Sequence, residues 1–271
     1  MRNNQNSQEL TIEQAISRAK KATKKGKIAD AVELYTAVLA QQPNHPVAKE
    51  KLNKLQKELP HDRSAQAQTT QPSQVQIAPL FYLYQTGQMA EVELACGKLL
   101  KSYPQSLAVL NILGVALRGQ GKLQEAVNIF NKAIQLKPSY AMAHSNLGLA
   151  LHDLGQLDAA VKSYERALMI DPDYPEAQNN LGLTLHKLGQ LDAAVKSYQK
   201  ALANSPGYGE AHNNLGLTLH KLGQLDAAVK SYEKALAINP GYAEAHNNLG
   251  NTFAELGQKD MAVKCYDKAL M

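Results

Sequence analysis

Asparagine side chains recur at a constant interval along the sequence, in two adjacent series. The series are Asn146, Asn180, Asn214 and Asn248, and Asn179, Asn213 and Asn247. An amide side chain carries both donors and an acceptor, so a row of amides can pair with the backbone of an extended peptide whatever its side chains. We therefore predict peptide recognition by these residues. The alternative is that near-identical repeats copied the asparagines by duplication, without selection for binding.

Charged and imidazole side chains follow the same spacing. The set comprises Glu176, Glu210, Glu244, His186, His220, Lys187 and Lys221. Histidine also binds metals, but no carboxylate or cysteine accompanies these histidines at the i+3 or i+4 spacing expected of a helical metal site. We expect copied, solvated histidines here and no metal.

Motifs of catalysis are not found in the sequence. It holds no Gly-rich phosphate loop, no G-x-S-x-G, no H-E-x-x-H and no paired cysteines. Its Ser, His and Asp residues recur with the same spacing, whereas an active site is a unique arrangement. We predict no catalytic residues, no cofactor and no enzymatic activity within the chain.

The same spacing governs proline, glycine, alanine and aromatic residues, and it defines units of two helices. Residues 172–205 and 206–239 are identical at 28 of 34 positions. We number the units so that position 1 falls at Leu107, Ala141, Pro175, Gly209 and Ala243. The glycine at position 15 suits a left-handed residue just past the end of the first helix. The proline at position 32 ends the second helix, because it lacks an N–H and disfavours helix in its predecessor.

These units resemble the tetratricopeptide repeat. The resemblance rests on glycine at position 8, alanine at 20 and 27, an aromatic residue at 24 and proline at 32, and it covers residues 104–271. The tryptophan usual at position 4 is replaced by Leu, His or Gln. The resemblance implies an all-α fold, a right-handed solenoid of helix-turn-helix repeats. The units are also similar to the repeat array of bacterial O-linked N-acetylglucosamine transferase-like proteins, which carries an asparagine ladder at position 6.

Helical phase indicates which face of the first helix is free. Positions 2, 5, 6, 9, 12 and 13 share one face at 100° per residue. Stacked repeats align these faces as a concave groove, and all candidate residues above fall on it. Tyrosines at positions 24 and 34 are expected to pack between repeats. Position 2 holds Met142 or a glutamate in four of the units, which disfavours the C-terminal carboxylate binding of chaperone-type tetratricopeptide domains.

The sequence suggests three segments. Residues 1–59 read as a degenerate N-terminal repeat plus a helix, 60–76 as a polar linker and 77–271 as the repeat array. Within the array, a degenerate repeat extends to 104, four clean repeats occupy 107–242 and a truncated repeat occupies 243–271. Pro79 lies inside the first helix of the degenerate repeat, so we expect that helix to be shortened or broken.

Positive charge is concentrated at the N-terminal end. The chain has 29 Lys+Arg and 24 Asp+Glu, a net charge of +5, and residues 1–60 carry the whole excess with 11 and 6 of these residues. Most of it lies on one helix that includes Arg18, Lys20, Lys21, Lys24 and Lys25. We interpret this cluster as the solvated face of a terminal repeat, which makes nucleic acid an unlikely partner.

The predicted function is a non-catalytic scaffold that binds proteins or extended peptides in the groove. The alternative is an N-terminal, substrate-recruiting arm of a longer transferase, either a glycosyltransferase of the O-linked N-acetylglucosamine type or a sulfotransferase. The last repeat lacks a capping helix, which suggests continuation of the chain or self-association. A polar N-terminus, two cysteines and no long apolar stretch predict a cytoplasmic protein without a membrane partner. The resemblance to bacterial transferase-like proteins implies a bacterial protein.

Overall fold

The structure is a computed structural model that describes residues 11–43, 45–58 and 71–270. Within these ranges every regular element is an α-helix, which confirms the predicted all-α class. The chain forms two compact units that divide between residues 81 and 82, so the boundary falls inside a helix. Most of the predicted linker, residues 60–70, lies outside the described residues.

The first unit contains three helices around a small core. They are α1 (Ile12–Lys24), α2 (Ile28–Gln41) and α3 (Pro46–Glu58). A capping box starts α1: the Thr11 hydroxyl accepts from the Gln14 N–H, and the Gln14 side chain accepts from the Thr11 N–H. Small and aromatic side chains close the core, with Ala19, Ala31 and Tyr35 almost fully buried.

We expected Pro79 to shorten or break its helix, and this prediction is wrong because the helix runs through the proline. It is α5 (Gln74–Gln85), and it continues through Pro79 for 12 residues in all. Proline removes one donor, which would otherwise bond the carbonyl of Val75, but the remaining bonds of the helix persist. The helix also begins inside the range predicted as linker.

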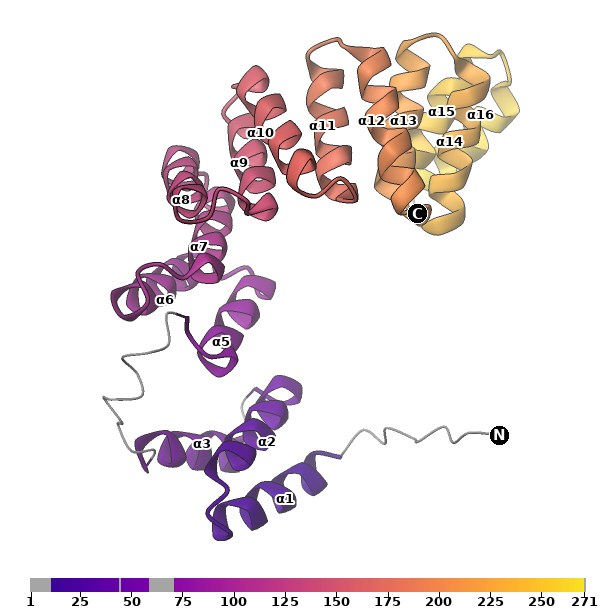
Figure 1. Ribbon diagram of the computed structural model, residues 1–271. Coiled ribbons are helices and arrows are strands. Elements are labelled where there is room, and N and C mark those ends of the chain that lie inside the picture. Colours follow the sequence, from indigo (N-terminus) through magenta and orange to yellow (C-terminus); the bar gives the residue numbers. More distant parts are fainter. Residues whose placement is uncertain (1–10, 44, 59–70, 271) are drawn as a thin grey trace, which may run out of the picture. The chain divides into compact units, whose positions relative to one another are not determined.

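The second unit is an array of helix pairs (Figure 1). After α6 (Met89–Ser102) each repeat contributes a first and a second helix, as predicted. The first helices are α7 (Leu107–Gly119), α9 (Ala141–Asp153), α11 (Pro175–Lys187), α13 (Gly209–Lys221) and α15 (Ala243–Glu255). The second helices are α8 (Leu123–Leu136), α10 (Leu157–Ile170), α12 (Leu191–Asn204), α14 (Leu225–Ile238) and α16 (Lys259–Ala269).

A glycine with positive φ turns the chain between the two helices of every pair, as predicted. Gly189 has φ 76° and joins α11 to α12. The N–H groups of Gly189 and Gln190 donate to the carbonyls of His186 and Leu185, at 2.9 Å each, so the end of α11 keeps its hydrogen bonds. The same turn recurs in the other pairs, whose glycines have φ between 73° and 76°.

Each second helix packs a tyrosine or phenylalanine onto a glycine of its own first helix. A Cβ atom built at Gly182 would lie 2.7 Å from Cε1 of Tyr198, too close for any side chain. Tyr198 is 1% exposed and Tyr164 is 0% exposed. Phe130, Tyr164, Tyr198 and Tyr232 are therefore core residues, each packed against its own first helix, and not an exposed stacking surface, while Tyr266 of the last repeat is half-buried.

First helices also contact one another along the array. Each packs against its own second helix, against the preceding second helix and against the next first helix. Consecutive second helices do not make contacts of this extent within residues 82–270. The array therefore curves towards its first helices, which places their free side chains on its concave face.

Candidate functional site: the face of the first helices

Four side chains of α11 form a continuous stripe on the concave face. They are Glu176, Asn180, Leu183 and Lys187, spaced i, i+4, i+7 and i+11. Glu176, Leu183 and Lys187 are exposed and Asn180 is half-buried. The spacing keeps all four on one side of the helix, and at 1.5 Å per residue the glutamate and lysine lie about 16 Å apart.

The neighbouring helix α13 repeats the stripe. It carries Glu210, Asn214, Leu217 and Lys221, of which the glutamate and lysine are exposed and Asn214 is 9% exposed. Two rows of the same chemistry thus stand side by side, with glutamates along one edge, lysines along the other and leucines between them. The helix α15 keeps the exposed Glu244 and the half-buried Asn248.

The position-5 asparagines lie elsewhere than predicted. Asn179 and Asn213 are both 0% exposed, because the following repeat covers them. With no exposed surface they cannot touch a ligand in this conformation, so the structure gives them a positioning role. Asn247 has the same position in the last repeat but is exposed, since no described helix packs over it.

Asn179 links α11 to α13 through both ends of its amide. Its Nδ2 atom donates to Oε1 of Glu210 at 3.3 Å, and its Oδ1 atom accepts from Nδ2 of Asn214 at 3.1 Å. A carboxylate can only accept, so Glu210 fixes which end of each amide carries the hydrogens. The Oδ1 atom of Asn214 is left over by this chain of hydrogen bonds, as an acceptor beside the groove.

The same link joins α13 to α15. Asn213 donates to Glu244 at 3.2 Å and accepts from Asn248 at 3.2 Å. Earlier in the array Asn146 donates to Asn111 at 2.7 Å. Asn180 differs from the other position-6 asparagines because position 5 of the preceding repeat, which supplies the acceptor in the other links, is Ser145 instead of an asparagine.

A second inter-repeat link ties His186 to Thr218. The Nδ1 atom of His186 lies 2.8 Å from Oγ1 of Thr218, and this hydroxyl donates its only hydrogen to the carbonyl of Asn214 at 2.8 Å. Nδ1 must therefore be the donor to the hydroxyl oxygen. In the neutral ring this leaves Nε2 as an acceptor.

His152 makes the equivalent bond to Thr184, at 2.8 Å, and Thr184 donates to the carbonyl of Asn180. Burial lowers the pKa of His152 and of His186, and the charge of the lysine on the next first helix, Lys187 or Lys221, lowers it further. Both rings are thus held neutral near pH 7. His220 departs from the pattern, because its Nε2 atom lies 2.9 Å from Oε2 of Glu255.

The threonines were not among the predicted site residues, although the sequence holds a signal for them. A histidine at position 12 of one repeat is followed by a threonine at position 10 of the next, which is Thr184, Thr218 or Thr252. Where Arg118 occupies position 12 instead, the next repeat has an alanine, Ala150, at position 10. The joint occurrence of histidine and threonine at these two positions is the sequence signal of the hydrogen bond between repeats.

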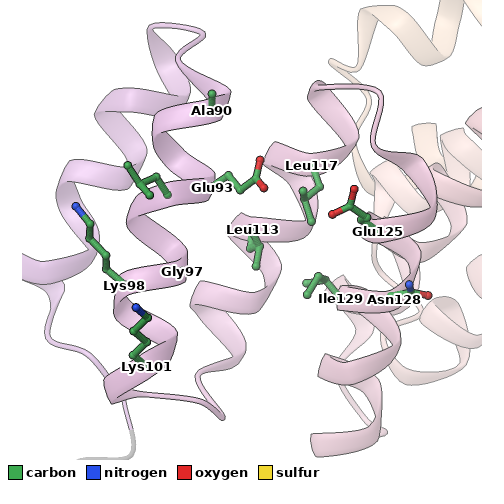
Figure 2. Close-up of a pocket in the computed structure, with 11 residues that line it drawn as sticks. Ala90, Glu93, Gly97, Lys98, Lys101, Leu113, Leu117, Glu125, Asn128 and Ile129 are labelled. Carbon is green, nitrogen blue, oxygen red and sulfur yellow. The ribbon is translucent and has the colours of Figure 1, made fainter.

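The other face of the array carries shallow hollows between second helices. One of about 830 Å³ lies among α6, α7 and α8, and Figure 2 shows Leu113 and Leu117 of α7 between the two second helices. Hollows of about 680 and 640 Å³ follow, and their linings correspond to each other with a shift of one repeat. Because the linings recur with the repeat, these hollows follow from the packing of every pair.

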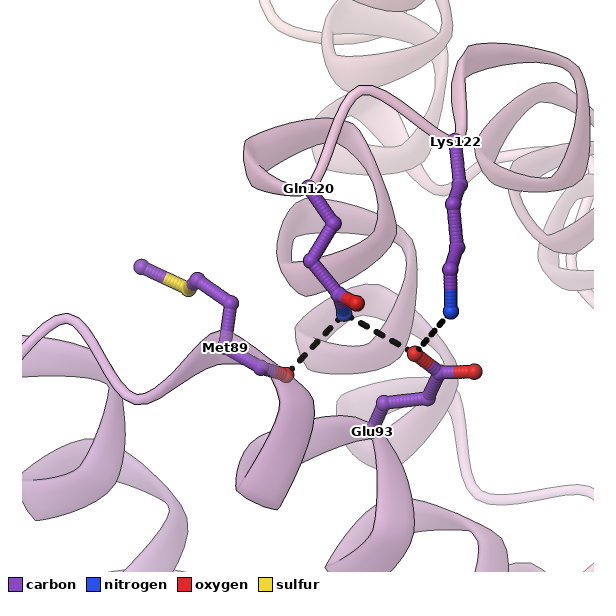
Figure 3. Close-up of polar contacts among 4 residues, drawn as sticks. All are labelled: Met89, Glu93, Gln120 and Lys122. Atoms are coloured by element: carbon purple, nitrogen blue, oxygen red, sulfur yellow. Dashed lines mark hydrogen bonds and ion pairs between the residues drawn. The ribbon is translucent and has the colours of Figure 1, made fainter.

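Polar contacts fasten the first of these junctions. Gln120 donates to the carbonyl of Met89 at 3.1 Å and to the Glu93 carboxylate at 2.9 Å, and Lys122 lies 2.7 Å from the same oxygen (Figure 3). The hydrogen bond from Lys122, followed by that from Gln120, lowers the pKa of Glu93. We assign this cluster to the joining of repeats.

Metal ligands do not converge anywhere in the described residues: no three His, Cys, Asp or Glu side chains gather closely enough to hold an ion. The position-4 histidines serve the fold, since Nε2 of His144, His212 and His246 lies 2.9–3.1 Å from the carbonyl of the proline that precedes each repeat. None of the described helices is long and apolar enough to cross a membrane.

Comparison with protein families decides the identity of the repeats. The family model described as TPR repeat matches residues 114–155, 149–189, 184–223 and 219–257, a continuous stretch of more than half of the chain. The chain belongs to the tetratricopeptide repeat (TPR) family. The resemblance predicted from glycine, alanine, aromatic and proline positions is thereby confirmed, and so is the solenoid.

Solved TPR structures match the array. A crystal structure of MamA is 29% identical, with a TM-score of 0.54, over 58% of this chain and 92% of MamA. YrrB, described as a TPR protein with an unusual peptide-binding site, is 26% identical, with a TM-score of 0.53, over 65% of this chain and 91% of its own. PilF of Pseudomonas aeruginosa, at 22% identity and a TM-score of 0.58 over 60% and 75% of the two chains, shares the fold. No curated protein matches the sequence significantly.

TPR repeats are protein-interaction modules, and the TPR neighbours of this chain support a role as an interaction scaffold. The stripes on α11 and α13 are the candidate binding surface for such an interaction.

Proposed function

We propose that the array binds an extended protein segment along the concave face of its first helices, without catalysing a reaction. The observation that carries this proposal is the pair of identical stripes on α11 and α13. Each carries an acid, an amide, a leucine and a lysine in the same order, with the acid and the lysine exposed at the two ends and the amide and the leucine less exposed on α13 than on α11. Side chains of that variety on a concave surface match the polar and apolar groups of a peptide.

The groups behind the stripes support the proposal because they are already oriented. His152 and His186 are held by Thr184 and Thr218, and Asn214 is held by Asn179. A binding surface whose side chains are fixed before the ligand arrives loses less conformational entropy on binding. The acceptors left over, Nε2 of the rings and Oδ1 of Asn214, suit the N–H groups of a peptide backbone.

Charge separates the two edges of the face. An extended segment lying over Leu183 and Leu217 has the glutamates of position 2 on one side and Lys187 and Lys221 on the other. We expect ligands that pair basic side chains with the glutamate edge and acidic side chains with the lysine edge, since like charges placed together weaken association. The peptide-binding site named for YrrB agrees with a ligand of this class.

The test is a selection of random dodecapeptides on the full chain, followed by fluorescence anisotropy with the enriched peptides. The groove variant Leu183→Ala/Lys187→Ala removes one leucine and one lysine from the stripe. The matched control, Met169→Ala/Lys200→Ala, removes an exposed apolar side chain and a lysine from second helices.

We expect the groove variant to weaken binding about tenfold or more, as truncation at an interface centre does, and the control to change it less than about twofold. Equal losses in the two variants would place the peptides elsewhere. A selection that enriches no peptide above an empty surface would contradict the proposal itself.

A further inference from the structure

Four lysines of the first unit surround one hollow of about 310 Å³. Lys20 and Lys24 come from α1, and Lys51 and Lys54 come from α3. Most of the excess positive charge is predicted from the sequence to lie on the helix that is α1. Folding brings the two lysines of α3 to the same point, although all of α2 separates them from α1 along the chain.

The rest of the lining is neutral. Thr23, Tyr35 and Leu55 complete it, and no acidic side chain contributes to it among the residues described. Tyr35 is 1% exposed and Leu55 is 3% exposed, so both close the floor of the hollow. Lys51 also meets the neighbouring Glu50 at 3.1 Å, an exposed pair of the kind that contributes little.

The hollow occupies the register of the His–Thr link of the array. Counting from Gly26 as from Gly155, Thr23 corresponds to His152, Tyr35 to Tyr164 and Leu55 to Thr184. The four lysines stand where the array has Leu149, Asp153, Asn180 and Leu183. Duplication of the array sequence therefore does not account for them.

We propose that this hollow binds a compact, multiply charged phosphate anion. Four ammonium groups around a small volume create a positive potential that an anion of similar charge relieves. A lysine binds phosphate as a point charge with three donors and demands no planar partner. The volume lies at the lower end of the range of small-molecule sites.

The lining disfavours larger anions. A single-stranded nucleic acid needs exposed aromatic side chains for its bases, and the one aromatic ring here is buried. An acidic peptide needs partners for its backbone, and no amide side chain lines the hollow, in contrast to the concave face of the array. Charge is the only property that the hollow offers in quantity.

Isothermal titration of the full chain with inorganic tripolyphosphate at low ionic strength tests the proposal. Two variants, Lys20→Gln/Lys24→Gln and Lys51→Gln/Lys54→Gln, each remove two charges from the hollow. The control Lys21→Gln/Lys25→Gln removes two exposed charges from the same end of α1, outside the hollow. Circular dichroism confirms that each variant is folded.

We expect each hollow variant to raise the dissociation constant about tenfold or more, because charge-assisted hydrogen bonds are the strong ones, and the control to raise it less than about twofold. Equal weakening by the control would show non-specific attraction to the basic unit and overturn the proposal. It is also overturned if the folded wild-type chain binds no tripolyphosphate, or if a hexaglutamate peptide binds more tightly than tripolyphosphate.

Discussion

The Nδ1 atom of His186 lies 2.8 Å from the hydroxyl oxygen of Thr218, on the next first helix of the array. Because that hydroxyl donates to the carbonyl of Asn214 within its own helix, the imidazole is the donor between the helices. The ring is thereby fixed in one tautomer, and the link depends on a threonine that contributes nothing to the exposed stripe.

Replacing Thr218 with valine keeps the shape of the side chain and removes the acceptor for His186. The Nδ1–H group is then left without a partner, which we expect to destabilise the array by about 1–3 kcal/mol. Thr252→Val is the matched control, since Thr252 makes the same bond within its helix, to Asn248 at 2.8 Å, while His220 turns to Glu255. Urea unfolding measures both, and equal shifts of the midpoint would contradict an important His–Thr bond.

Stability should fall on mild acidification because His152 and His186 have lowered pKa values. Burial is the main cause and the neighbouring lysine the second. An unfolded chain takes up protons below its ordinary value of about 6.5 while the native rings resist them, so the free energy of unfolding falls as the pH drops from about 7.5 to 5.5. Thermal unfolding across this range measures the slope, and a flat profile would contradict the lowered values.

The contribution of the lysine can be separated from that of burial. Lys187→Met keeps much of the side-chain volume and removes a positive charge near His152, so the pKa of His152 should rise. Lys200→Met removes an exposed charge from α12 and should leave that pKa where it is. Proton NMR titration of the imidazole resonances distinguishes the two variants; an unchanged pKa of His152 in Lys187→Met would contradict a contribution from this lysine.

Replacing the glycine at position 8 even with alanine should lower the stability of the array. In Gly182→Ala the new methyl group would meet the ring of Tyr198 at 2.7 Å. Overpacking typically costs about 1–3 kcal/mol, whereas alanine in a helix gains at most about 1 kcal/mol over glycine, so the net effect is destabilising. Gly207→Ala has nothing within 4 Å of its Cβ and serves as the control.

If crowding is the cause, shortening the partner restores stability. The double variant Gly182→Ala/Tyr198→Leu should lose less than the sum of its two single variants, because contacting residues are not additive. Additive losses in urea unfolding would mean that the methyl group and the ring do not compete for the same space.

Asn179 and Asn247 offer a direct comparison of one residue type at one repeat position. Asn179→Ala leaves Asn214 and Glu210 without a bond to the covered amide and should cost about 1–3 kcal/mol. Asn247→Ala alters an exposed side chain and should stay within about 0.5 kcal/mol. A similar midpoint of urea unfolding for both variants would remove the positioning role assigned to Asn179.

Repeat boundaries, turns and core positions could be predicted from the sequence because each has a local cause. A positive φ selects glycine at 189, a missing N–H selects the end of a helix before a proline, and Tyr198 recurs opposite Gly182. These causes act within one 34-residue repeat, so they appear directly in the regular spacing of the sequence.

Contacts between neighbouring repeats were harder to predict. Helical phase placed Asn179 and Asn180 on the same free face, yet the next repeat covers only the first. The packing of the next first helix decides which of the two is covered, and the pattern of a single helix does not encode that packing. The convergence of Lys51 and Lys54 on Lys20 has the same origin, since it depends on where α3 lies against α1.

Every link described for the array runs between one repeat and the next. The chain of Glu210, Asn179 and Asn214 uses two first helices, and that of Glu244, Asn213 and Asn248 uses the following two. Removing residues 206–239 would therefore bring Asn179 against Glu244 and Asn248, the same partner types that it has now. Unequal recombination between such similar coding segments would lengthen or shorten the binding face without creating a frayed joint, so the number of repeats can change in evolution more freely than their content.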